Sequence, residues 1–171
     1  MKNYLISFSV LFLFSLTVFA QDSKKEAKEK KRQEQYESIQ NIVQSGKYEF
    51  IGRKANPQQG RQIDLATRSN YLRINGENAV ADMPYFGRAY SGGYSSSDGG
   101  IKFDGIAANY SVDKNDKKRR LTIKFKVDGS DDNYNCTLTI SGMESASLSI
   151  SSNKRQVISY TGLVQEVSDD Q

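Results

Sequence analysis

The side chains that most enzymes use for acid–base and nucleophilic chemistry are scarce in this sequence. Its 171 residues include no histidine, and its only cysteine is Cys136. A Ser-His-Asp triad, a Cys-His pair and a mixed histidine–cysteine zinc site are therefore excluded within this chain. Cys136 shares the inward face of its strand pattern with Tyr134 and Leu138, which is typical of a buried thiol rather than an activated nucleophile. We expect no catalytic residue, no metal site and no cofactor.

Carboxylates are the remaining route to general acid–base catalysis. Four aspartates flank the most unusual segment of the chain: Asp64, Asp82, Asp98 and Asp104. Nothing in their spacing indicates that two of them converge. Residues 128–132 begin like a calcium loop, but Asn133 occupies the position that requires glycine, and a hairpin turn explains the same residues. A carbohydrate-active enzyme built on carboxylate pairs is the least favoured functional hypothesis.

The unusual segment is residues 83–94, which hold four aromatic side chains, one arginine and three glycines without strand-like alternation. Together with residues 95–100 it makes a loop of 18 residues, a length typical of functional loops. Aromatic and arginine side chains often anchor recognition surfaces. One interpretation is a ligand-binding site made of five side chains: Tyr85, Phe86, Arg88, Tyr90 and Tyr94. The alternative is that the aromatics close one end of the fold.

Positive charge is concentrated near the start of the chain. Residues 22–32 hold six basic and three acidic side chains, whereas 17 of each follow from residue 33 onward. The folded body therefore lacks the basic face of a nucleic-acid-binding domain. We expect any weak contact with an anionic surface to be made by the six basic side chains of this arm: Lys24, Lys25, Lys28, Lys30, Lys31 and Arg32.

The first residues are predicted to export the protein. Residues 1–20 combine a short positive start, an apolar run and small residues at Val18 and Ala20, which is the pattern of a signal peptide cleaved after Ala20. No cysteine follows, which argues against a lipid anchor, and no later apolar run is long enough to cross a membrane. We expect the protein in the periplasm or outside the cell.

Residues 21–46 are predicted to form a charged helix. Ser23 and Glu26 have the spacing of a capping box, and Gly46 is a plausible C-terminal stop. The first half is polar all round, so we expect it to be a solvated tether. Four apolar residues of the second half share one stripe and should dock on the domain: Tyr36, Ile39, Ile42 and Val43.

Residues 47–165 are predicted to form a β domain, followed by a tail over residues 166–171. Alternating runs such as 120–127, 134–140 and 146–151 place one face in the core and one in water. A further run puts Ile106, Ala108, Tyr110 and Val112 on an apolar face. The fold class is mainly β. We expect an antiparallel meander of about 8–10 strands that closes into a lipocalin-like barrel or a two-sheet sandwich, preceded by one N-terminal α-helix.

Two motifs resemble those of a bacterial family, domain of unknown function 4251. Residues 83–90 followed by 100–103 resemble its signature, and residues 155–162 are similar to its C-terminal motif. The order of export signal, charged helix and β domain is similar too. The resemblance implies a secreted or envelope protein of bacteria. It implies no activity, so no catalytic residue is transferred.

These observations favour a non-catalytic protein that binds a small ligand at the aromatic–glycine loop of a β-barrel. The alternative is a cell-envelope module for protein–protein or surface interaction, in which the basic helix is a docking arm. The two differ in whether the interior of the barrel is hollow.

Overall fold

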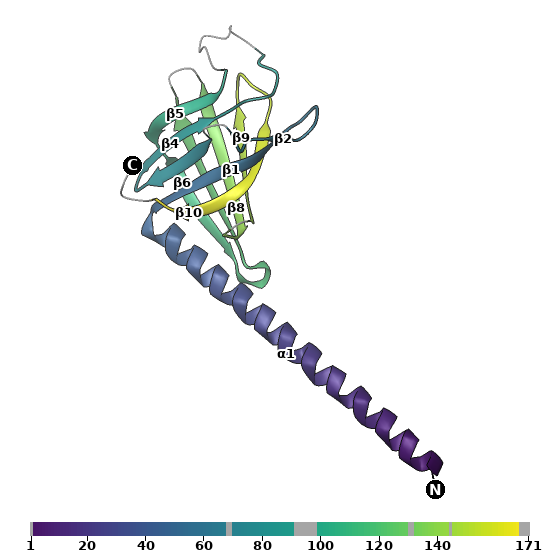
Figure 1. Cartoon of the computed structure of the whole chain (residues 1–171). Coiled ribbons are helices and arrows are strands. Elements are labelled where there is room, and N and C mark those ends of the chain that lie inside the picture. Colours follow the sequence, from purple (N-terminus) through teal and green to yellow (C-terminus); the bar gives the residue numbers. More distant parts are fainter. Residues whose placement is uncertain (1, 68–69, 91–98, 130–131, 144, 168–171) are drawn as a thin grey trace. The chain divides into compact units, whose positions relative to one another are not determined.

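The computed structural model describes all residues except 1, 68–69, 91–98, 130–131, 144 and 168–171 (Figure 1). It begins with one helix, α1 (Lys2–Ser45), as the sequence predicts for the N-terminal side of the β domain. Gly46 ends this helix with a φ of 69°, a left-handed conformation that glycine adopts without strain. Its amide donates to the Val43 carbonyl at 3.2 Å. The signal peptide at residues 1–20 stays a prediction.

Ten strands follow, and each neighbouring pair is antiparallel, so the predicted mainly β fold is confirmed. The strands are β1 (Lys47–Pro57), β2 (Ile63–Asp64), β3 (Tyr71–Asn75), β4 (Asn78–Met83), β5 (Ile101–Ile106), β6 (Ala108–Asn115), β7 (Arg120–Asp128), β8 (Asn133–Gly142), β9 (Ser145–Ser152) and β10 (Ile158–Glu166). A single 3₁₀ turn, Asp116–Lys118, joins β6 to β7.

The strand order is β5-β4-β3-β1-β10-β9-β8-β7-β6, with β2 paired to β1. The first and last strands of the domain therefore lie side by side in the middle of the order (Figure 1). Sequence neighbours pair almost everywhere else, which is the meander that short turns predict. The sheet curls into a nearly closed barrel rather than two separate sheets.

The barrel closes where β5 continues into β6. Because every pairing is antiparallel, the strand order requires β5 and β6 to run in the same direction. They are two halves of one bent strand, the first paired with β4 and the second with β7. At the bend, the ring of Phe103 lies 5.3 Å from that of Tyr134 on β8, centroid to centroid. The bend between β5 and β6 thus brings the two ends of the sheet together and nearly closes the barrel.

The predicted apolar face of residues 106–112 is wrong for Ile106, Ala108 and Tyr110, which are exposed, while Val112 is partly buried. Ile106 is 70% exposed, whereas its neighbour Ala107 is buried. The cause is the change of partner at the bend, where Asn109 takes a positive φ of 55° and the register with β7 shifts between Ala108 and Ser111. A bulge of this kind interrupts the simple alternation of faces.

The second half of α1 belongs to the core, as its apolar stripe predicts. Tyr36, Ile39, Ile42 and Val43 are all buried in the same cluster as the inward side chains of the strands. The Tyr36 hydroxyl donates to Asp116 Oδ1 at 2.8 Å. The chain divides into two units, Met1–Gln35 and Tyr36–Gln171. The buried stripe thus begins where the second unit begins.

The interior of the barrel is filled by side chains. A hollow able to hold a ligand would leave its lining residues with surface that a water molecule could reach. Nine large inward side chains are instead 0% exposed: Tyr48, Phe50, Leu72, Ile74, Leu121, Ile123, Leu138, Leu148 and Tyr160. Within the described part of the chain, these residues belong to one contiguous core. Both grooves described below lie on the outer surface.

Candidate functional site

Residues 83–90 are the described part of the unusual segment, here called the aromatic–glycine segment, and they lie against the turn between β9 and β10. The Tyr85 hydroxyl is shared between two carbonyl oxygens, that of Arg88 at 2.9 Å and that of Gln156 at 3.1 Å. The guanidinium of Arg155 lies over the Tyr85 ring, 5.3 Å from its centroid. Burial raises the pKa of the Tyr85 hydroxyl, although its backbone contact and Arg155 oppose that shift. Tyr85 is therefore held inside the segment as an anchor.

Three further contacts fix the segment to the body of the barrel. The Tyr160 hydroxyl, from the interior, donates to the Pro84 carbonyl at 2.9 Å. Arg155 Nη1 donates to the carbonyls of Gly99 at 3.2 Å and Gly100 at 2.7 Å, where the loop returns to β5. Phe86 is partly buried and packs on the core. The interpretation of aromatics that close one end of the barrel thus describes Tyr85 and Phe86.

Two other predicted site residues face outward. Tyr90 is 66% exposed, and Arg88 is exposed beside it. Their backbone is paired with the β9–β10 turn, since the Tyr90 amide donates to the Lys154 carbonyl at 2.7 Å and the Gln156 amide to the Arg88 carbonyl at 3.0 Å. The fifth predicted residue, Tyr94, lies outside the described residues. The structure therefore separates the four described residues into two anchors and an outward pair.

Val157, in the same turn, is 38% exposed and adds an apolar side chain that the sequence analysis missed. We call the exposed pair Arg88 and Tyr90 the aromatic rim. Tyr90 and Val157 are two of the four large hydrophobic side chains that are exposed among the described residues. The motif resemblance covers residues 155–162, but it does not indicate that the turn Lys154–Val157 pairs with residues 88–90, which only the structure shows.

The aspartates considered for catalysis are engaged in ordinary surface contacts. Asp82 Oδ2 forms an ion pair with Lys102 at 3.6 Å, and Asp104 Oδ1 accepts from Asn78 at 2.9 Å. Asp64 Oδ1 accepts from the Ala66 amide at 2.8 Å. Asp98 lies outside the described residues. Over the part of the chain that the structure describes, no group of three or more acidic, histidine or cysteine side chains could hold a metal ion.

Cys136 points into the core, and burial raises the pKa of its thiol to about 12. Because the thiolate is the reactive form, we expect the folded protein not to react with a disulfide reagent even near pH 9, where a free thiol is about half ionised or more. The unfolded chain should react at one thiol per molecule. Labelling with and without high urea measures this.

The sign of the pH effect on stability follows from the same shift. The thiol keeps its proton in the folded state to a higher pH than in the unfolded state. The contribution of the buried thiol to the free energy of unfolding is therefore fully present below the unfolded pKa of about 8.5. It is lost as the pH rises toward 12. Rapid labelling of the native protein at neutral pH would contradict a buried Cys136.

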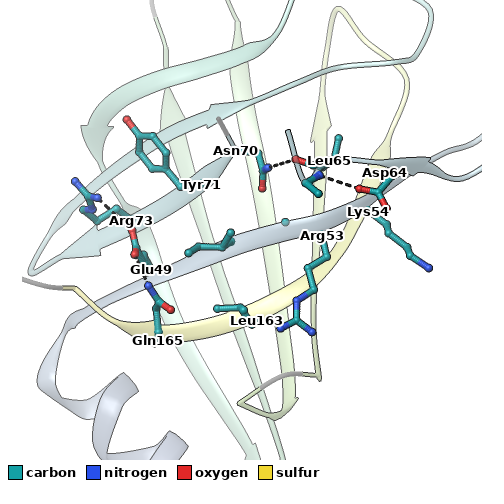
Figure 2. A pocket seen from close by; sticks show the side chains of 13 residues that line it. Glu49, Arg53, Lys54, Asp64, Leu65, Asn70, Tyr71, Arg73, Leu163 and Gln165 are labelled. Carbon is teal, nitrogen blue, oxygen red and sulfur yellow. Dashed lines mark hydrogen bonds and ion pairs between the residues drawn. The ribbon is translucent and has the colours of Figure 1, made fainter. Parts of the chain in front are cut away.

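A groove of about 800 Å³ runs along the outer side of β1, and the sequence analysis did not find it (Figure 2). Its apolar floor includes Ile51 and Leu163. At one end the buried Glu49 accepts from Arg73 Nη2 at 3.1 Å and from Gln165 Nε2 at 2.8 Å. Both carboxylate oxygens of Glu49 are thus engaged, which suits a structural role better than acid–base catalysis.

The charges in this β1 groove are mixed. Arg73 also lies over the ring of Tyr71, 5.1 Å from its centroid, so its guanidinium is held on two sides. At the other end, Lys54 and Asp64 are cross-strand partners of β1 and β2 (Figure 2). The charges that line this groove therefore do not select one sign of ligand.

These features define an antiparallel β-barrel with a filled interior, one N-terminal helix and no constellation of catalytic side chains among the described residues. The family model of DUF4251, a domain of unknown function, matches residues 30–164. The chain belongs to the DUF4251 family. The match confirms the resemblance of its two motifs.

A solved structure has the same fold. It is the crystal structure of a DUF4251 family protein from Bacteroides eggerthii DSM 20697, with a TM-score of 0.59 and 15% sequence identity. The alignment covers 77% of this chain and 87% of that one. No curated protein matches the sequence. None of the described helices is long and apolar enough to span a bilayer.

Proposed function

We propose that this protein is an exported, non-catalytic binding module that contacts its partner through the aromatic rim. The observation that carries the proposal is the 66% exposure of Tyr90 on a backbone held by hydrogen bonds to the β9–β10 turn. A fixed, exposed tyrosine beside an arginine is the composition of a recognition hot spot. Little ordering entropy remains to be lost on binding, because the anchors Tyr85 and Phe86 already hold the segment.

The filled interior favours a partner that stays on the outer surface over a small ligand carried inside the barrel. An envelope protein or another surface component fits this requirement. The basic arm at residues 22–32 could add weak attraction to an anionic surface, because its side chains from Lys24 onward are exposed. In this proposal the rim supplies specificity and the arm supplies only proximity.

The test is a photoreactive amino acid placed at Tyr90 in the bacterium that exports the protein. We expect a discrete crosslinked adduct from position 90. Ile106 is the matched control, because it is similarly exposed, at 70%, and lies at the far end of β5 from Gly100, whose carbonyl contacts Arg155 of the turn. The same adduct from both positions would contradict a specific rim. Loss of association on deleting residues 21–32, with Arg88 and Tyr90 dispensable, would assign the role to the arm instead.

A further inference from the structure

A second outer groove, of about 560 Å³, crosses the sheet from β7 to β1. Three cations line it: Arg53, Lys54 and Arg120. Five hydroxyl groups line it as well: Thr139, Ser141, Ser145, Ser147 and Thr161. No carboxylate is among its described lining residues, and Glu144, in the turn between β8 and β9, lies outside the described residues. We call this feature the hydroxyl groove.

Three of these hydroxyls, together with that of Thr122 beyond the groove, form a row across four strands that ends at Lys54 on a fifth. Cross-strand pairing places Thr122 opposite Thr139, Thr139 opposite Ser147, Ser147 opposite Thr161, and Thr161 opposite Lys54. Adjacent strands are about 4.8 Å apart, so the row offers one hydroxyl at each such step and ends at an ammonium group. Asp113 and Asp64 pair with the two ends of the row but do not line the groove.

Two irregularities of the sheet fall in this groove. The register of β1 with β10 shifts between Gly52 and Lys54, and that of β8 with β9 shifts between Ile140 and Gly142. The extra residues are Arg53 and Ser141, and both line the groove. At the first bulge Arg53 and Lys54 are both exposed, although strict alternation would turn one of them inward. The bulge thus brings two successive cations to one edge of the row.

The chemistry of these groups selects a ligand class. A hydroxyl both donates and accepts, so a row of them is complementary to a chain of sugar hydroxyls. Lysine and arginine pair with carboxylates, so the ligand should be acidic. No aromatic side chain faces outward from β8, β9 or β10 to stack on a base, which disfavours single-stranded nucleic acid.

We infer that the hydroxyl groove binds an extended acidic polysaccharide, with Lys54 and Arg120 paired to its carboxylates and the threonine–serine row bonded to its hydroxyls. The chain would cross the strands, so that successive sugar units meet successive strands. This site is separate from the aromatic rim, and the inference does not depend on the proposed function.

The experiment is affinity electrophoresis of the purified protein with polygalacturonate, dextran, poly-L-glutamate or poly(dT). We expect clear retardation by polygalacturonate, little by dextran, which lacks charge, and little by polyglutamate, which lacks sugar hydroxyls. The double variant Lys54→Ser/Arg120→Ser should weaken binding about tenfold or more, since two charge-assisted contacts are lost. Thr139→Val/Thr161→Val should weaken it several-fold with all charges kept.

The matched control is Lys24→Ser/Lys25→Ser, which removes the same charge from the exposed arm. It should leave polygalacturonate binding unchanged, and thermal unfolding should show all variants folded. Equal loss in the control, or equal retardation by polyglutamate, would reduce the effect to general electrostatics and overturn the inference. Stronger retardation by poly(dT) would overturn it in favour of nucleic acid. If the photoreactive residue at position 90 gave no adduct while polygalacturonate still bound, the proposed function alone would be rejected.

Discussion

Replacing Gly162 with alanine should destabilise the barrel more than any other single methyl group added to its wall. Gly162 lies opposite Gly52 where β10 crosses the bulge of β1. A Cβ atom at position 162 would overlap the carbonyl oxygen of Ile51 and lie 3.0 Å from the Gly52 Cα. The obstacle is backbone, which cannot rotate away as a side chain can. β1 and β10, the first and last strands of the domain, would have to move apart at this point.

We expect Gly162→Ala to lower the free energy of unfolding by about 3 kcal/mol or more, the upper end of the cost of overpacking. For a chain of this size that corresponds to a fall of about 6–12 °C in the midpoint of thermal unfolding. Urea denaturation and calorimetry measure it. The control is Gly142→Ala, whose Cβ would meet only the Ser145 side chain at an ordinary 3.7 Å. Equal losses in the two variants would contradict a close approach at Gly162.

Replacing Tyr160 with alanine should have an effect of similar size for a different reason. Tyr160 is 0% exposed and fills the interior of the barrel, while its hydroxyl reaches the Pro84 carbonyl at 2.9 Å. Burial raises the pKa of this hydroxyl, so it stays a donor at any ordinary pH. The alanine variant loses both the packing and the hydrogen bond, and we expect a loss of about 3–5 kcal/mol in the free energy of unfolding.

The variant Tyr160→Phe separates the two contributions. It keeps the ring and loses only the donor to Pro84, so we expect about 1 kcal/mol of global stability to be lost. Hydrogen exchange of the Tyr90 amide, which bonds to Lys154, should accelerate because the aromatic–glycine segment loses one tether. A phenylalanine variant as unstable as the alanine variant would show that the hydrogen bond, not the packing, dominates. Unchanged exchange at Tyr90 would show that Pro84 is not a tether.

The Gly162 variant also bears on the hydroxyl groove. The bulge that brings Arg53 and Lys54 to the outer face is the same bulge that requires glycine at 162. A substitution at this bulge that leaves the protein folded should therefore change both the binding of polygalacturonate and the free energy of unfolding. The aromatic rim, tied to β9–β10 by its own hydrogen bonds, should be affected less.

Several features followed from the sequence alone because they depend on local periodicity and on composition. The apolar stripe Tyr36–Val43 marked the part of the helix that is buried. A spacing of three to four residues places apolar side chains on one face of a helix, whatever surface that face packs against. Strict alternation over 121–127 and 134–140 identified inward faces correctly. The lack of histidine excluded whole classes of mechanism. A local pattern suffices for such statements.

Other features depended on which strands become neighbours, and only the tertiary structure decided them. The bend at Ala107 exposes Ile106 because one strand changes partner from β4 to β7. Tyr85 and Tyr90 look alike in the sequence, yet the carbonyl of Gln156, 71 residues away, makes one an anchor and leaves the other at the surface. The row from Thr122 to Lys54 joins five strands. Register between distant segments is set by packing and turn geometry, and no single stretch of the chain encodes it.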